Sequence, residues 1–301
     1  MINITHKHST LRKAIAQAVV EVSKEETIAA LRERKVPKGD VFEMAKTAGL
    51  FAVKRTSDLI PDCHPLPVEF TSVSYRIEGL KVYVEMEVHT IYKTGVEVEA
   101  MHGVSVVALT MYDMLKPIDK GITIKDIRLL EKKGGKSNVK AVDVSSVRAA
   151  VLVCSDRVSQ GLMEDRSGKL LVAGLEEMGI DQVTYACLPD DEAGITSWLK
   201  DKVSEQQLIL VSGGSGLGPR DRSTEAIRSV LDREIPGIME HYRNYGQQRI
   251  PTAMLSRGVA GMSGQCLIIG LPGSPGAAQD ALHALFPAVF HVLEVERGGG
   301  H

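Results

Sequence analysis

The chain is poor in aromatic residues, paired cysteines and long apolar runs, and each shortage excludes a class of protein. Aromatic residues make up 4% of the 301 residues, with one tryptophan, which argues against a platform on which nucleic-acid bases stack. The cysteines are scattered and form no Cys-x-x-Cys pair, which disfavours a zinc site or a disulfide framework. No apolar run approaches the roughly 20 residues that a membrane span needs, and no signal-peptide segment is recognisable. We therefore expect a cytoplasmic protein without membrane contacts.

An excess of charge of one sign is also missing. The chain has 36 Lys and Arg against 38 Asp and Glu, a net charge of −2. Such a balance provides no basic field for DNA, RNA or an anionic membrane. A hydrophobic content of 44% in 301 residues is enough for real cores, and about 100–200 residues per domain suggests two domains.

The first part of the chain, residues 1–146, has the pattern of an α+β domain. Two stretches have helical periodicity, 11–34 and 41–54. Apolar residues alternate over 75–88, and the strand pattern continues at 96–99. A helix rich in small residues is predicted over 103–116, and a basic loop with two glycines over 132–140. A short polar joint then ends the domain near Ser146.

Residues 147–301 follow a different pattern, in which strands and helices alternate. Strands are predicted at 147–154, 183–188, 208–211 and 266–269, and helices at 167–178, 192–203, 223–233 and 277–292. This succession predicts a doubly wound, mostly parallel sheet. Ligands of such sheets bind outside the carboxyl ends of the strands.

A glycine-rich loop is the most informative feature of the second part. The strand 208–211 leads into Ser212-Gly213-Gly214-Ser215-Gly216, and a helix-like segment opens near Ser223. Glycines allow backbone N–H groups to approach a phosphate, and the helix start adds its dipole. No Gly-Lys-Ser/Thr follows, so the loop is not a Walker A motif. A plain strand–helix turn remains the alternative at this point.

Acidic residues and a second loop support the phosphate interpretation. Four segments are expected to meet at the strand ends: 155–157, 188–191, 213–221 and 272–275. Among them, Asp190 and Asp221 suit a bound Mg²⁺ that neutralises phosphate oxygens. The alternative is that each aspartate forms a turn or caps a helix.

The first part holds many ionisable residues. Lys38 precedes a helix, and His64 lies in a proline-rich loop. The strand pattern places Glu97 and Glu99 on one face, and helical spacing places Asp113 and Lys116 on one face. Together with Lys132 and Lys136, they suit polyphosphate binding and acid–base chemistry on a purine-derived ring. Salt-bridged helices and a solvated basic loop are the structural alternative.

The second part resembles the MoaB/MogA family of molybdenum cofactor biosynthesis. The motifs that carry the resemblance are SDR, GLMEDRSG, LPDD, SGGSGLGPRD, REIPG, LSRGVAG and LPGSP, in this order. The resemblance implies adenylylation of molybdopterin with MgATP, with Asp190 and Asp221 as catalytic aspartates and Mg²⁺ ligands. It further implies a pterin or nucleotide phosphate site at Gly213, Gly214, Ser215, Gly216 and Ser274.

The first part resembles the MoaC family, cyclic pyranopterin monophosphate synthase. The resemblance rests on KGDVF, KRTSDLIPDCHPLP, YKTGVEVEAMHGVSVVALTMYDMLK and IRLLEKKGGKS. It implies a ferredoxin-like antiparallel sheet with helices, no metal or organic cofactor, and release of pyrophosphate from a cyclised guanosine triphosphate. It places catalysis on Asp113 and Lys116, assisted by Lys38, His64 and Lys132. The implied substrate contacts are Asp62, Cys63, His64, Val98 and Glu99.

The two resemblances together predict a bifunctional enzyme of molybdenum cofactor biosynthesis whose partners are pterin and purine nucleotide substrates. They imply a homo-oligomer, because the MoaC family forms hexamers with sites at subunit interfaces and MoaB/MogA domains form trimers. One alternative makes the second domain a molybdopterin-binding or assembly module without catalysis. Another, a general nucleotide-binding regulator, leaves the motifs of the first domain unexplained.

Overall fold

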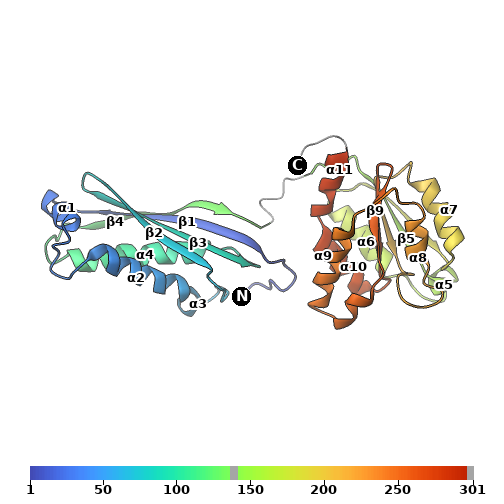
Figure 1. Ribbon diagram of the computed structural model, residues 1–301, viewed down its shortest axis with the longest axis horizontal. Coiled ribbons are helices and arrows are strands. Elements are labelled where there is room, and N and C mark those ends of the chain that lie inside the picture. Colours follow the sequence, from blue (N-terminus) through green and yellow to red (C-terminus); the bar gives the residue numbers. More distant parts are fainter. Residues whose placement is uncertain (136–141, 297–301) are drawn as a thin grey trace. The chain divides into compact units, whose positions relative to one another are not determined.

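The chain divides into two units with separate hydrophobic cores, residues 1–140 and 141–301 (Figure 1). The structure is a computed structural model, which describes residues 1–135 and 142–296. The sequence-based boundary after residue 146 assigns Val144 to the first unit, whereas Val144 packs with Val147 in the core of the second. Among the helices of the described residues, none is long and apolar enough to cross a membrane.

The first unit is an antiparallel sheet covered on one face by helices. Its elements are β1 (Thr10–Glu21), α1 (Glu25–Arg32), α2 (Val41–Lys54), α3 (Thr56–Leu59), β2 (Phe70–Glu78), β3 (Lys81–Tyr92), α4 (Glu97–Leu115) and β4 (Thr123–Lys133). The strands lie in the order β2-β3-β1-β4, every neighbouring pair antiparallel. This β-α-β-β-α-β arrangement is ferredoxin-like, so the prediction of an antiparallel sheet with helices is confirmed.

Apolar alternation explains how the sheet meets its helices. Val82, Val84, Met86 and Val88 are fully buried on one face of β3, as their alternation predicted. Helices α2 and α4 lie along that face and bury it (Figure 1). The predicted strand over 75–88 is, however, two strands, because the backbone turns at Gly79 with φ +54°.

Two predictions of secondary structure in this unit are wrong. The predicted helix over 11–34 is strand β1 followed by α1, because Ala14, Ala16 and Ala18 alternate into the core and β1 pairs with both β3 and β4. Tertiary pairing here overrides the helical propensity of alanine. The predicted strand at 96–99 is the first turn of α4, where acidic residues favour a helix start. Glu97 and Glu99 therefore do not share a face.

The second unit is a doubly wound sheet. Its strands are β5 (Arg148–Cys154), β6 (Gln182–Leu188), β7 (Leu208–Ser212), β8 (Arg233–Glu234), β9 (Ala260–Ser263) and β10 (Cys266–Leu271), in the order β6-β5-β7-β10-β9-β8. The strands β6, β5, β7 and β10 are parallel, and β9 and β8 are antiparallel to their neighbours. The mostly parallel sheet predicted from the sequence is confirmed.

Helices cover both faces of this sheet (Figure 1). They are α5 (Asp156–Ser159), α6 (Ser167–Glu177), α7 (Glu192–Lys202), α8 (Ser223–Arg228), α9 (Pro236–Gln247), α10 (Pro275–Leu285) and α11 (His291–Glu296), with 3-10 turns at Pro251–Leu255 (η2) and Ala288–Phe290. Two predicted helices are shorter than expected. Helix α8 ends at Arg228, because Arg233 pairs in β8, and α10 ends at Leu285, before Pro287, which has no N–H to donate.

Separate cores allow a test of independence between the units. Fragments 1–140 and 141–301 are each expected to fold, because each keeps its own core. A fragment that begins at residue 147 loses Val144, which is 8% exposed. Its free energy of unfolding should therefore fall by roughly 1–3 kcal/mol relative to 141–301. Urea denaturation monitored by circular dichroism measures the difference. Equal stability of the two fragments would show that Val144 contributes nothing to the core.

Candidate active sites

A carboxylate between two lysines lies at the end of α4. The Oδ2 atom of Asp113 is 2.7 Å from Lys38 Nζ, and its Oδ1 atom is 2.7 Å from Lys116 Nζ. Lys38 also donates to the main-chain oxygen of Asp113 at 2.9 Å. Hydrogen bonds from Lys116 and Lys38 lower the pKa of Asp113 to about 2. The same carboxylate raises the pKa of Lys116. Asp113 and Lys116 therefore carry opposite charges at neutral pH, in an exposed cluster with Lys38.

A second group of ionisable residues gathers at the beginning of α4. The Nζ atom of Lys132, on β4, lies 2.5 Å from Glu97 Oε1. The Cys63 thiol donates to Glu99 Oε1 at 3.1 Å. The ring of His64 lies 2.8 Å from the main-chain oxygen of Ile2. The structure thus brings together residues from the proline-rich loop, α4 and β4 that are far apart in the sequence.

Glu99 is the unusual member of this second group. It is 2% exposed, and its Oε2 atom is buried without a hydrogen-bond partner in the described part of the chain. Burial raises the pKa of Glu99. Burial and the hydrogen bond to Glu99 raise the pKa of the Cys63 thiol to about 12, so Cys63 is no thiolate nucleophile at neutral pH. A buried, unpartnered carboxyl oxygen is costly unless a ligand binds it.

The two groups lie at opposite ends of α4. Asp113 follows Glu99 by 14 helical residues, which corresponds to roughly 21 Å along the axis at about 1.5 Å per residue. One copy of the chain therefore does not unite all the residues predicted for the first site. Among the predicted substrate contacts, Val98 is 44% exposed, whereas Asp62 pairs with the N-terminal amine at 3.0 Å. Of the predicted basic loop, residues 136–140 lie outside the described residues, so Lys136 has no placement.

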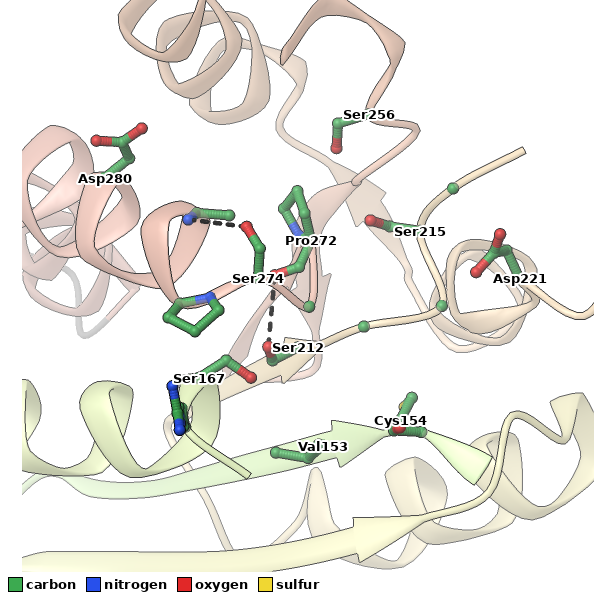
Figure 2. A pocket seen from close by; sticks show the side chains of 18 of the residues that line it. Val153, Cys154, Ser167, Ser212, Ser215, Asp221, Ser256, Pro272, Ser274 and Asp280 are labelled. Carbon is green, nitrogen blue, oxygen red and sulfur yellow. Dashed lines mark hydrogen bonds between the residues drawn. The ribbon is translucent and has the colours of Figure 1, made fainter. Parts of the chain in front are cut away.

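The four predicted loops of the second unit meet at the carboxyl ends of the parallel strands. The N–H of Asp156 donates to Asp190 Oδ2 and the N–H of Asp190 to Asp156 Oδ1, both at 3.2 Å. Arg220 reaches Asp156 with its Nε atom at 2.7 Å. The Ser212 hydroxyl contacts the Pro272 oxygen at 3.4 Å, which Figure 2 shows between the two glycine-containing loops. The loops therefore form one continuous site.

Glycine is required at the start of the glycine loop. Gly213 has φ +104°, and a Cβ atom there would lie 2.2 Å from the main-chain oxygen of Cys154. Gly214 has φ +62°, and its Cβ would lie 3.1 Å from Asp190 Oδ1. Both values of φ disfavour residues with side chains. The backbone can thus pass close to Asp190, as a phosphate-binding loop requires.

The two predicted aspartates differ in their surroundings. Asp221 Oδ2 accepts the Gly218 N–H at 2.7 Å, and its side chain lines the cavity (Figure 2). Asp190 Oδ1 is buried without a partner in the described part of the chain. Burial raises the pKa of Asp190, and the negative charges of Asp156 and Asp221 raise it further. Asp190 thus occupies a position where its negative charge is unfavourable unless a cation or donor approaches.

Arg257 is a structural contributor that the sequence analysis did not single out. Its guanidinium donates to the main-chain oxygens of Gly216 at 2.7 Å and Asp221 at 2.8 Å. Glu225 pairs with the same guanidinium at 2.6 Å. Arg257 therefore holds the glycine loop at two points. The signal was present in the motif LSRGVAG, but nothing local in the sequence indicates which carbonyls the arginine reaches.

A cavity of about 1000 Å³ opens beside these loops. The glycine loop, Asp221 and Ser274 line one part of it. Ser274 is the N-cap of α10, and its hydroxyl accepts the Ala277 N–H at 3.2 Å (Figure 2). The hydroxyl proton can still be donated to an anion. Ser215 also lines the cavity and is 4% exposed. These residues place hydroxyl and backbone N–H groups beside the Asp221 carboxylate at this end of the cavity.

Comparisons with known proteins agree with this division into two sites. Residues 1–135 match the MoaC family, and residues 150–291 match the probable molybdopterin binding domain. The molybdenum cofactor biosynthesis bifunctional protein of Chlorobaculum tepidum is 40% identical over 302 residues, which cover 100% of this chain and 96% of that protein. The chain belongs to the family of bifunctional molybdenum cofactor biosynthesis proteins.

Each half of this bifunctional protein also has relatives of its own. The cyclic pyranopterin monophosphate synthase of Pelobacter propionicus is 49% identical over 141 residues, which cover 46% of this chain and 88% of that enzyme. The crystal structure of the molybdopterin biosynthesis enzyme MoaB from Thermus thermophilus covers 50% of this chain and 97% of that chain, with 38% identity and a TM-score of 0.48. The two family matches and the bifunctional relative show that the chain joins a MoaC region to a MoaB/MogA-like region.

Proposed function

We propose that the first unit converts 3′,8-cyclo-7,8-dihydroguanosine 5′-triphosphate to cyclic pyranopterin monophosphate and pyrophosphate. The observation that carries the proposal is Asp113 paired at 2.7 Å with both Lys38 and Lys116. Two ammonium groups held side by side suit a triphosphate and its pyrophosphate leaving group. Because its pKa is about 2, Asp113 is ionised at neutral pH. It therefore orients the two lysines as an anion, and we assign proton handling to the Asp113–Lys116 pair as a unit.

The complete site of this unit requires a second copy of the chain. The residues gathered at the start of α4, including His64 and Lys132, lie roughly 21 Å along the helix from Asp113. In a two-fold dimer, the beginning of α4 from one copy completes the end of α4 from the other, and two equal sites form.

Subunit complementation tests this arrangement. Asp113→Asn and His64→Asn variants are each expected to be inactive in pyrophosphate release. Co-refolding equal amounts should restore roughly a quarter of wild-type activity, because half of the dimers are mixed and each mixed dimer has one intact site of two. A mixture of Asp113→Asn with Lys116→Met, both at the same end of α4, is the matched control and should stay inactive. Recovery in the control, or none in the first mixture, would contradict the shared site.

For the second unit, we propose transfer of AMP from MgATP to the terminal phosphate of molybdopterin. The supporting observation is the buried, unpartnered Oδ1 of Asp190 beside the glycine loop. In this reaction a phosphate oxygen of molybdopterin attacks the α-phosphorus of ATP. The bond to the bridging oxygen breaks, and pyrophosphate leaves. The N–H groups of Gly214, Ser215 and Gly216 and the hydroxyl of Ser274 would hold the phosphates in line, whereas the Gly213 N–H donates to the Leu271 oxygen.

The residues present fit the Mg²⁺ that accompanies ATP. Asp190 and Asp221 would hold it, because Asp190 has an oxygen without a partner and its pKa is raised by burial and by neighbouring carboxylates. When bound, Mg²⁺ offsets the negative charge of the phosphates. No group of three or more His, Cys, Asp or Glu side chains arranged for a metal occurs among the described residues. Two carboxylates suffice, because Mg²⁺ usually keeps several waters and binds substrate phosphates.

The test of this activity uses the wild-type protein. Purified chain, molybdopterin and ATP are expected to give adenylylated molybdopterin and pyrophosphate only when Mg²⁺ is present. Equilibrium binding of molybdopterin is measured in parallel on the same preparation. Binding without Mg²⁺-dependent AMP transfer would replace the enzyme by a non-catalytic molybdopterin-binding module.

A further inference from the structure

The cavity of the second unit has two chemically different ends. The glycine loop and Ser274 form an end whose N–H and O–H donors suit a phosphate, with the Asp221 carboxylate beside them. Asp280 lines the cavity from further along α10, and Figure 2 shows it well away from Asp221, on the helix that begins after Ser274. Ser274 and Asp280 are six residues apart, about 9 Å along the helix axis. A ligand that fills the cavity must therefore place a phosphate at one end and tolerate a carboxylate at the other.

The surroundings of Asp280 leave its carboxylate able to accept hydrogen bonds. Its side chain is 18% exposed, and Arg249 Nε lies 3.7 Å from Asp280 Oδ1, beyond hydrogen-bond distance. The Arg249 guanidinium lies 3.4 Å from the centre of the Tyr245 ring and donates to the main-chain oxygen of Tyr245. Within the described parts of the chain, the Asp280 carboxylate receives no hydrogen bond. Burial also raises the pKa of Asp280.

A half-buried carboxylate in this position selects for a ligand with two adjacent N–H donors. The 2-amino-4-oxopyrimidine edge of a pterin presents such a pair, from the exocyclic amino group and the neighbouring ring N–H. A carboxylate accepts both in a bidentate arrangement. Adenine presents a donor beside an acceptor, and the acceptor would face a carboxylate oxygen.

We propose that Asp280 is a specificity-determining residue that binds the 2-amino-4-oxopyrimidine edge of the pterin while the glycine loop binds its phosphate. The inference rests on the proposed molybdopterin activity of this unit and adds the orientation of the substrate. Arg249 is a positioning residue, because its stacking on Tyr245 keeps a cation near Asp280 without occupying the carboxylate. The charge of Arg249 favours the ionised form of Asp280 that accepts both hydrogen bonds.

A pair of probes that differ at this edge tests the proposal. 6-Hydroxymethylpterin phosphate carries two adjacent donors, and 6-hydroxymethyl-lumazine phosphate replaces the amino group by a carbonyl oxygen. Fluorescence titration of the full chain is expected to show tighter binding of the pterin by about 10- to 100-fold. Asp280→Asn presents one acceptor and one donor. This variant should therefore reverse the preference, and Asp280→Ala should abolish it.

Matched measurements separate the possible outcomes. Asp201→Asn, on the exposed face of α7, removes the same charge outside the cavity and should leave the ratio of affinities unchanged. An unchanged ratio in Asp280→Asn, with wild-type thermal stability, overturns the proposal and leaves Asp280 only its contact with Arg249. GMP carries the same edge and AMP does not, so competition by GMP that disappears in Asp280→Ala would assign the site to guanine instead of pterin. Failure of the wild type to bind either molybdopterin or the pterin probe would overturn the proposed function as well.

Discussion

Asp113→Asn is expected to lower pyrophosphate release by the first unit by about 10²- to 10⁴-fold, the usual contribution of a group that handles protons in a reaction. The substitution keeps the shape of the side chain but removes the charge that binds Lys38 and Lys116, each at 2.7 Å. Both ammonium groups then lose their common partner, and neither is held beside the other. The rate should be measured with saturating substrate and compared with the circular dichroism spectrum of the same sample.

Asp126→Asn is the matched control for this experiment. Asp126 is an exposed residue of β4 with φ +51°, a conformation that asparagine also adopts readily. It should keep the wild-type rate. Nearly normal pyrophosphate release by a folded Asp113→Asn protein would show that Asp113 takes no part in the reaction. Lys38, Asp113 and Lys116 would then be only a cluster of surface ion pairs.

Asp190→Asn should reduce Mg²⁺-dependent AMP transfer by at least about 10³-fold. The substitution removes a negative charge that would hold Mg²⁺, and the metal stabilises the transition state by several kcal/mol. Molybdopterin binding should remain, since loop donors hold the phosphate and Asp280 the ring. Pyrophosphate release from ATP in the presence of molybdopterin measures transfer, and an equilibrium titration measures binding. A wild-type transfer rate in this variant would exclude Asp190 from the reaction. Asp221→Ala should have the same effect on transfer.

Asp190→Asn should not destabilise the protein at neutral pH. Burial and nearby carboxylates raise the pKa of Asp190 in the folded state. A carboxyl group with a raised folded-state pKa contributes stability below its unfolded pKa, near 4, and this stability is lost as the pH rises through the folded-state pKa. Asparagine does not ionise, so Asp190→Asn does not lose stability as the pH rises. Its melting temperature should therefore equal or exceed that of the wild type at pH 8. A lower melting temperature at that pH would indicate that the charged form is stabilised in the folded state.

Gly214→Val is expected to abolish molybdopterin binding, and AMP transfer with it. Gly214 has φ +62°, and a Cβ atom would lie 3.1 Å from Asp190 Oδ1. A β-branched side chain is disfavoured in this conformation and blocks the approach of phosphate to the loop. Binding and transfer should therefore be lost together, unlike the loss of transfer alone in Asp190→Asn.

Local patterns in the sequence determined most of the second unit. Strands β5, β7 and β10 are short apolar runs, each followed by a helix, and they are buried on both faces, as the inner strands of a parallel sheet are. The loops that follow these strands must meet at one edge, because parallel strands place their carboxyl ends together. The convergence of Asp190, Asp221 and the glycine loop was therefore predictable from residue order.

The first unit was harder to predict because its signals conflict. The alanines of β1 favour a helix by propensity, and only pairing with β3 and β4 makes this segment a strand. The alternation of Val96 and Val98 imitates a strand, although α4 begins at Glu97. In both places the competing propensities are nearly equal, so contacts with distant parts of the chain decided the outcome.

Composition, motif order and strand–helix alternation thus determined the two regions, their fold classes and the residues that carry the family motifs. The tertiary structure decided which side chains are in contact. It brought Lys38 into contact with Asp113, and Cys63 into contact with Glu99, at opposite ends of α4. It also placed Asp280 and Asp221 at opposite ends of one cavity. No local pattern encodes such relations, because side chains far apart in the sequence meet only after the sheets and helices have packed.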